Sequence, residues 1–235
     1  MTRRWGRDPF RTGLVQAVED AARQALASST TPGLAVALVH HGRLIWAAGY
    51  GAATAHPHDA HGRQIGDFAF AEQAAAGLVT TAPDLARFLA AALAGPRGEP
   101  PGRGVLSPAG VQVALTAAPA TDGRWGLGYG LGLTPGGDLL AYHEGANRGW
   151  RAGLALLPDR RAGIALLANG DAGSAPIDAV VQQWLALASL NRVHTRLRNA
   201  LLAFLAVAAA AALGLAVRRR TPPEASRPSA RLRVR

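Results

Sequence analysis

YHEGANRGWRAGLALLPDRRAGIALLANGD, residues 142–171 of the 235-residue chain, carries the clearest structural signal in the sequence. It contains two apolar runs, residues 152–157 and 163–168, whose length and aliphatic content are typical of buried strands. The turn-forming sequence Pro-Asp-Arg-Arg at 158–161 separates them, and another short run, 139–143, comes just before. This stretch therefore predicts three consecutive antiparallel strands.

The flanking sequence predicts a hairpin, one more strand and several helices. Residues 31–51, TPGLAVALVHHGRLIWAAGYG, place a His41-Gly42 turn between two apolar runs, which indicates a β-hairpin. Apolar periodicity and helix-start residues predict four helices, at 12–28, 77–93, 107–116 and 174–190. A glycine-rich run at 125–133 predicts one more strand. We expect an α+β fold, with an antiparallel sheet of about five strands and the N- and C-terminal helices on one face.

Three of these segments resemble one known family. Residues 31–51, 77–95 (GLVTTAPDLARFLAAALAG) and 142–171 are similar to the serine β-lactamase and penicillin-binding-protein family. The resemblance is to the branch that contains class C β-lactamases, D-alanyl-D-alanine carboxypeptidases and related esterases. Members of that branch carry a large helical subdomain between the first two segments, whereas this chain has about 25 residues there. The resemblance thus implies the α/β half of the fold without its helical subdomain.

The same resemblance implies a catalytic site of which one motif remains. The family combines a Ser-x-x-Lys nucleophile, a Tyr-x-Asn or Tyr-x-Ser loop, and a Lys-x-Gly or His-x-Gly strand. The third motif is present as His143-Glu144-Gly145. By resemblance His143 would be an acid–base group, Gly145 would let a ligand approach the strand, and the Ala146 N–H would supply half of an oxyanion hole. The first two motifs are missing, since the chain has no lysine and all 25 of its basic residues are arginine.

Other residues could carry chemistry, but local structure explains them better. Four serines stand at predicted helix ends, where a hydroxyl can cap the helix: Ser28, Ser29, Ser107 and Ser174. The alternative is that one of them is a nucleophile paired with His143. The sequence HPHDAH, residues 56–61, has three imidazoles and a carboxylate that could ligate zinc. A solvent-exposed loop is the favoured interpretation there, so we predict no metal site and no cofactor.

The C-terminal region has a different composition. Residues 200–217, ALLAFLAVAAAAALGLAV, form an uninterrupted apolar run that is just long enough to span a bilayer as a helix. Residues 191–235 carry ten arginines and one glutamate, whereas the rest of the chain is almost neutral, which argues against nucleic-acid binding. We expect a domain at 1–190, a linker at 191–199, a transmembrane helix at 200–217 and a basic disordered tail at 218–235.

These observations predict a single-pass cell-membrane protein of the serine hydrolase family that has lost its catalytic residues. The charge bias around the apolar run favours an extracytoplasmic domain, provided that a signal peptide precedes the recorded start. The expected partners are the lipid bilayer and a peptide or β-lactam-like small molecule. Two alternatives remain open: a noncatalytic binding or regulatory module, and a fragment of the gene for an active hydrolase.

Overall fold

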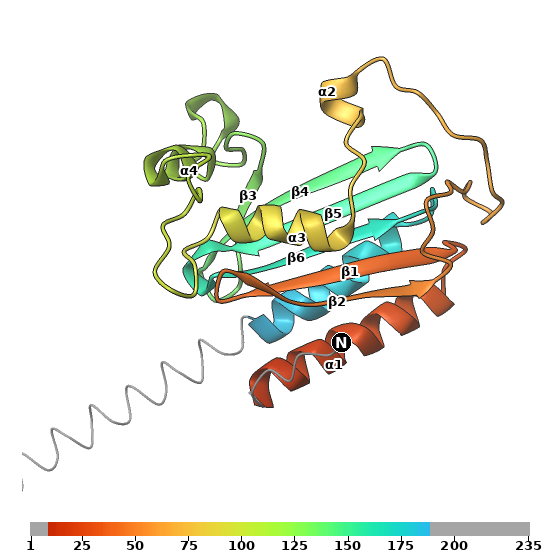
Figure 1. The fold of residues 1–235 in the computed structure, drawn as a ribbon, viewed down its shortest axis with the longest axis horizontal. Helices are drawn as coiled ribbons and strands as arrows, with labels where there is room; N and C mark the ends of the chain where they lie inside the picture. The colour runs from red at the N-terminus through yellow and green to blue at the C-terminus, as the bar shows by residue number, and fades with distance from the viewer. Residues whose placement is uncertain (1–8, 189–235) are drawn as a thin grey trace, which may run out of the picture. The chain divides into compact units, whose positions relative to one another are not determined.

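A six-stranded antiparallel sheet lies between two layers of helix in the computed structural model, which describes residues 9–188 (Figure 1). The spatial strand order is β2-β1-β6-β5-β4-β3. The helices and strands, in chain order, are α1 (Pro9–Ala27), β1 (Gly33–His40), β2 (Arg43–Gly51), α2 (Gln73–Ala76), α3 (Ala82–Ala91), α4 (Pro108–Ala114), β3 (Gly130–Leu133), β4 (Leu139–Asn147), β5 (Trp150–Leu157), β6 (Ala162–Ala168) and a last helix over residues 174–188.

The predicted hairpin and strand meander are confirmed, and they join one sheet. β1 pairs with β2 on one side and with β6 on the other, so residues 33–51 are hydrogen-bonded to a strand more than 120 positions later. The sheet has six strands, one more than the expected number of about five, and the glycine-rich β3, itself predicted as a strand, lies at its edge. The strand expected at 125–133 begins only at Gly130, since residues 125–128 turn back and Trp125 forms an isolated bridge with Gly130.

Each face of the sheet has its own hydrophobic cluster. On one face α1 and the helix at 174–188 pack together, which confirms the prediction that the terminal helices share a face. Val18, Val180 and Trp184 are fully buried there between helices and strands. The second face is covered by α3 and, in part, by α4. Residues 9–188 contain no helix that is both long and apolar enough to cross a membrane, and the apolar run at 200–217 lies outside the described residues.

Helix α3 is shorter than the sequence predicts. It begins after Thr81, whose Oγ1 accepts a hydrogen bond from the Asp84 N–H at 3.3 Å, so residues 77–80 remain outside the helix. It packs mainly against β6, β1 and β2 rather than against β4, the strand that carries His143. Ser107 caps α4 in the same way, as predicted, by accepting from the Gly110 N–H at 3.0 Å.

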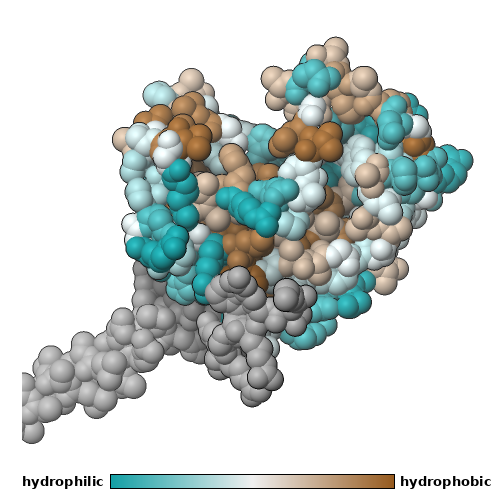
Figure 2. All heavy atoms as spheres, in the orientation of Figure 1, coloured by the Kyte–Doolittle hydropathy of each residue, from teal (hydrophilic) through white to brown (hydrophobic). Residues whose placement is uncertain are grey.

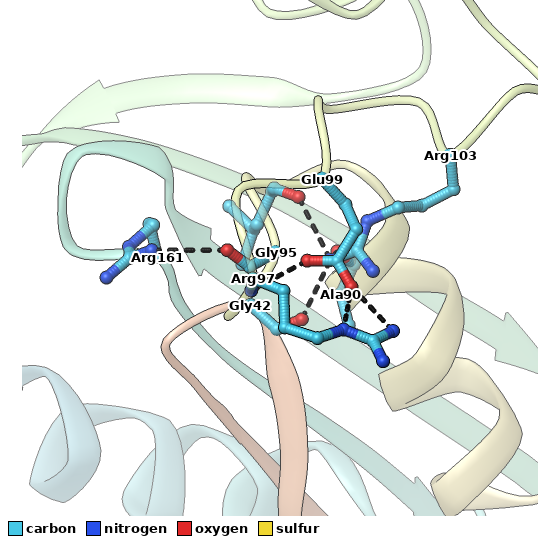
Figure 3. A network of polar contacts seen from close by, with 8 residues as sticks. Gly42, Ala90, Gly95, Arg97, Glu99, Arg103 and Arg161 are labelled. Atoms are coloured by element: carbon cyan, nitrogen blue, oxygen red, sulfur yellow. Dashed lines mark hydrogen bonds and ion pairs between the residues drawn. The ribbon is translucent and has the colours of Figure 1, made fainter.

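Arginine side chains connect the C-terminal end of α3 to the β1–β2 turn (Figure 3). One nitrogen of Arg103, Nη2, donates to the carbonyls of Gly42, Ala90 and Leu93 at 2.9, 3.0 and 3.2 Å. Two of these carbonyls are at the end of the helix, where backbone oxygens lack helical partners. Arg103 therefore links the C-terminal end of α3 to the β1–β2 turn.

Candidate functional site

Strand β4 has an open edge along the residues that resemble a catalytic motif. β3 pairs with β4 only from Leu139 to Tyr142, whereas β5 pairs with it up to Asn147. Within residues 9–188, the segment 143–147 thus has a neighbouring strand on one side only. An edge of this kind presents backbone N–H and C=O groups that an extended ligand can use.

The side chains of β4 alternate between the two faces of the sheet. Ala141 belongs to the cluster beneath α3, so His143, Gly145 and Asn147 lie on the α3 face. Ala146 falls on the face of α1, and its predicted role rests on its backbone N–H rather than on its side chain. The three positions that resemblance indicates are thus adjacent along one strand, as their spacing in the sequence requires.

His143 is exposed, and one of its ring nitrogens is already engaged. Its Nδ1 lies 2.9 Å from the carbonyl oxygen of Gly128. A carbonyl only accepts, so Nδ1 carries a proton, and the neutral ring then has its acceptor lone pair on Nε2. Gly128, with a φ of 82°, lies in the turn before β3. The turn therefore orients the imidazole so that Nε2 can accept a proton or a hydrogen bond from a ligand.

Asn147 and Arg148 were missed by the sequence analysis. The Asn147 amide Nδ2 donates to the carbonyl of Ala76 at 3.1 Å, and the Arg148 guanidinium lies 4.7 Å from the centre of the Phe68 ring. These contacts hold the segment around α2 beside the C-terminal end of β4. The only sequence signal for Asn147 is its position two residues after Gly145, on the same face of a strand.

Gly145 lies between His143 and Asn147 and leaves space on the strand. A Cβ at this position would lie 3.3 Å from the Cβ of Ala152, closer than an ordinary van der Waals contact, so Gly145 keeps this part of the strand free of a side chain. Figure 2 shows that this face is hollowed between two projecting parts, one formed around α2 and the other around α4. The contacts of His143 and Asn147 reach the two sides of this hollow. The arrangement can bind an extended group, orient it against a strand and offer it one imidazole nitrogen.

Three of the four serines within the described residues are hydrogen-bonded to backbone groups. Ser28 Oγ donates to the carbonyls of Gln24 and Ala25, and Ser29 Oγ accepts from the Thr31 N–H. Ser107 is the cap of α4, and Ser174 is the first residue of the last helix. No hydroxyl of these four is hydrogen-bonded to a histidine, and Ser28 and Ser29 line a cavity of about 360 Å³ on the face of α1 rather than that of His143.

The HPHDAH segment contributes to packing. His58 is buried, and its Nδ1 donates to the carbonyl of Asn169 at 2.8 Å. Asp59 binds Arg63 through Nε at 2.8 Å, and the hydrogen bonds from Arg63 lower the pKa of Asp59 to about 2. His61 is exposed. Between residues 9 and 188 no three His, Cys, Asp or Glu side chains gather as a metal-ion site.

Comparison with known proteins places the chain in a family. The sequence profile described as Beta-lactamase matches residues 52–188, which is more than half of the chain. The chain therefore belongs to the β-lactamase family, as its resemblance predicted. The matched region includes the strands around His143 and the last helix, and it begins immediately after β2.

Solved structures give more limited matches. The crystal structure of SurE is 28% identical in sequence, and the match covers 47% of this chain and 26% of SurE, with a TM-score of 0.38. The structure of SurE with D-Leu is 29% identical, and the match covers 37% of this chain and 21% of SurE, with a TM-score of 0.32. The octameric penicillin-binding protein homologue from Pyrococcus abyssi is 24% identical over 46% and 23%, with a TM-score of 0.35. The chain spans about a quarter or less of the length of these proteins. No curated protein sequence matches it.

Proposed function

We propose that this chain is a catalytically degenerate member of the β-lactamase family that binds a ligand along the open edge of β4 and is anchored in the cell membrane. The proposal rests on the hydrogen bonding of the serines that could act as nucleophiles and on the lack of a lysine base. Ser28, Ser29 and Ser107 are each hydrogen-bonded to backbone groups, and the chain contains no lysine to act as a base. Acylation of a serine requires both a nucleophile and a neighbouring proton acceptor.

The ligand in this proposal is a peptide or a β-lactam-like small molecule. The edge at 143–147 offers backbone hydrogen bonds, Gly145 offers space, and His143 offers Nε2 as an acceptor. A β-lactam carbonyl and a peptide carbonyl can bind to such an edge in the same way, because both accept hydrogen bonds from backbone N–H groups and both lie along the strand. A noncatalytic binding module is the form of this function that the remaining residues support best.

The membrane anchor in this proposal is the apolar run at 200–217. An 18-residue helix rises about 27 Å, close to the thickness of a bilayer core, and three arginines follow it directly. The domain would then act on ligands near the membrane surface, on the extracytoplasmic side if a signal peptide precedes the recorded start. Placement at the membrane would compensate for weak binding by restricting the ligand search to a surface.

A pair of assays on the full-length chain tests the proposal. We expect no covalent adduct with a fluorescent penicillin, and no turnover of nitrocefin or a short ester above that of a His143→Ala variant. Noncovalent binding of a D-alanyl-D-alanine peptide, measured by isothermal titration, should be present and weaker in H143A. A stoichiometric adduct on any serine would contradict catalytic degeneracy, and mapping it by mass spectrometry would identify the nucleophile. Absence of both adduct and binding would exclude a ligand site on β4.

A further inference from the structure

The large apolar side chains that are exposed in this structure all belong to one part of the sequence. Among the described residues, they come without exception from positions 68–133, and none lies on α1, the hairpin, β5, β6 or the last helix. The most exposed are Val79, Val105 and Leu78, at 96%, 89% and 78%. Figure 2 shows apolar surface on both projecting parts of this face and in the hollow between them.

The part around α2 has almost no packing of its own. From Asp59 to Thr81 no residue is buried, although this segment includes Phe68, Leu78 and Val79. It touches the sheet through the Asn147 amide and the Arg148 guanidinium described above. A 23-residue segment without one buried side chain gains little from folding onto the domain alone, so its ordering requires additional contacts.

The part around α4 exposes a second set of apolar side chains across the hollow. Its loop at 125–127 is fixed to the helix by backbone bonds, from Leu127 to Ala114 and from Ala118 to Trp125. The apolar side chains exposed here are Val105, Leu106, Val113, Trp125 and Leu127. Phe88 of α3, 58% exposed, lies on the same face of the sheet. Both parts that border the hollow therefore carry exposed apolar side chains.

We infer that this face binds the same face of a second copy of the chain. The two copies would be related by a two-fold axis, with the α2 part of each lying in the hollow of the other. A face that carries a projection beside a hollow can pair with itself in this reciprocal way. The inference concerns association and does not depend on the proposed ligand binding.

The exposed area matches what a stable dimer needs. The nine apolar side chains of the two parts and α3 together expose on the order of 1,000 Å². A stable interface buries about 800 Å² on each partner, whereas the surface of a monomer rarely shows an apolar patch beyond a few hundred Å². A smaller occupant, such as a single peptide strand, would leave much of this surface in water.

Sedimentation velocity of the full-length chain tests the inference, with all variants in one buffer and one mild detergent. We expect a concentration-dependent dimer whose dissociation constant rises at least about tenfold in Val79→Glu and in Leu127→Glu, because each places a charge within the apolar contact. Gln182→Glu, which adds the same charge at an exposed position of the last helix, should leave the dimer unchanged. Circular dichroism should show that all three variants remain folded.

A cross-link gives the geometry. The chain has no cysteine, so V79C and L127C each carry a single thiol. Oxidation of a mixture of the two proteins should yield a disulfide-linked peptide joining positions 79 and 127 of different chains, and Q182C mixed with either should yield none. A wild-type chain that stays monomeric at every concentration would overturn the inference, as would a dimer that survives both charged variants. Vesicle binding by a monomer that V79E and L127E abolish would assign the face to a lipid surface instead.

Discussion

Arg103 offers the sharpest test of how the fold holds α3 in place. Its side chain is partly buried, and Nη2 alone donates to three carbonyls, two at the end of α3 and one in the β1–β2 turn (Figure 3). Its Nε is buried without a hydrogen-bond partner, which reduces the net gain. A hydrogen bond from a charged donor contributes about 1.5–3 kcal/mol, and burying the unpaired Nε costs part of that. We expect Arg103→Ala to lower the free energy of unfolding by about 2–3 kcal/mol.

A second substitution at the same position separates the contribution of the guanidinium from the strain of the backbone conformation. Arg103 has a φ of 46°, in the left-handed region that glycine adopts without strain. Arg103→Gly should therefore be about 1 kcal/mol more stable than Arg103→Ala, although both lack the guanidinium. Urea denaturation followed by tryptophan fluorescence reports both values, since Trp184 is fully buried. A loss below about 0.5 kcal/mol in R103A would refute the role assigned to the three hydrogen bonds.

Four further outcomes are expected. Thr81→Ala should destabilise the fold by about 1 kcal/mol through loss of the α3 cap, measured in the same urea assay, with Thr81→Ser close to wild type. Arg63→Ala should return the pKa of Asp59 from about 2 toward 3.8, as measured by NMR of the carboxyl group. Because the pKa of Asp59 is lowered in the folded state, the carboxylate stabilises the fold above pH 3.8, and this contribution is lost as the pH falls through about 2. Burial raises the pKa of Tyr50 from 10.0 to about 12, so stability should decline as the pH rises above 10, and phenolate absorbance should show the delayed ionisation. Deleting residues 200–235 should move the chain from the membrane pellet to the supernatant, and a truncated chain that remains an intact membrane protein would contradict the anchor.

The face that we assign to a second copy also carries the open edge of β4. Both parts that border the hollow are contacted from this strand, by His143 through Gly128 and by Asn147 through Ala76. Pairing of two copies would therefore compete with a ligand for the same space. Adding the D-alanyl-D-alanine peptide should shift the dimer toward monomer if both proposals hold, because anything that binds only one state favours that state.

Much of the fold could be predicted because its signals are local. The His41-Gly42 turn, the Pro158–Arg160 turn and the cap at Ser107 each depend on a few consecutive residues, and each was found where the sequence predicted it. The shared face of the two terminal helices also followed from the sequence, since each helix has one apolar stripe that must be buried. The family was legible from the motifs of the hairpin and the meander.

The surroundings of the site could not be read in this way. His143 was identified by its motif, but its partner Gly128 lies 15 residues away, in a turn whose path depends on the register of β3. Asn147 meets Ala76 across 71 positions of sequence, and Arg103 reaches Gly42 across 61. No periodicity relates such pairs, because they meet only after the sheet has brought distant segments together.

Residue identity and neighbours along the chain are enough to predict the family, the strand that carries His143 and the lack of a lysine base. Three features emerge only in the folded chain: β4 has an unpaired edge, α3 lies over β6 and β1 instead of over His143, and the large apolar side chains that stay exposed come from residues 68–133. They could not be predicted because burial and pairing are properties of surfaces. Which surface covers which depends on sheet order and on the few long-range contacts that hold each helix in place.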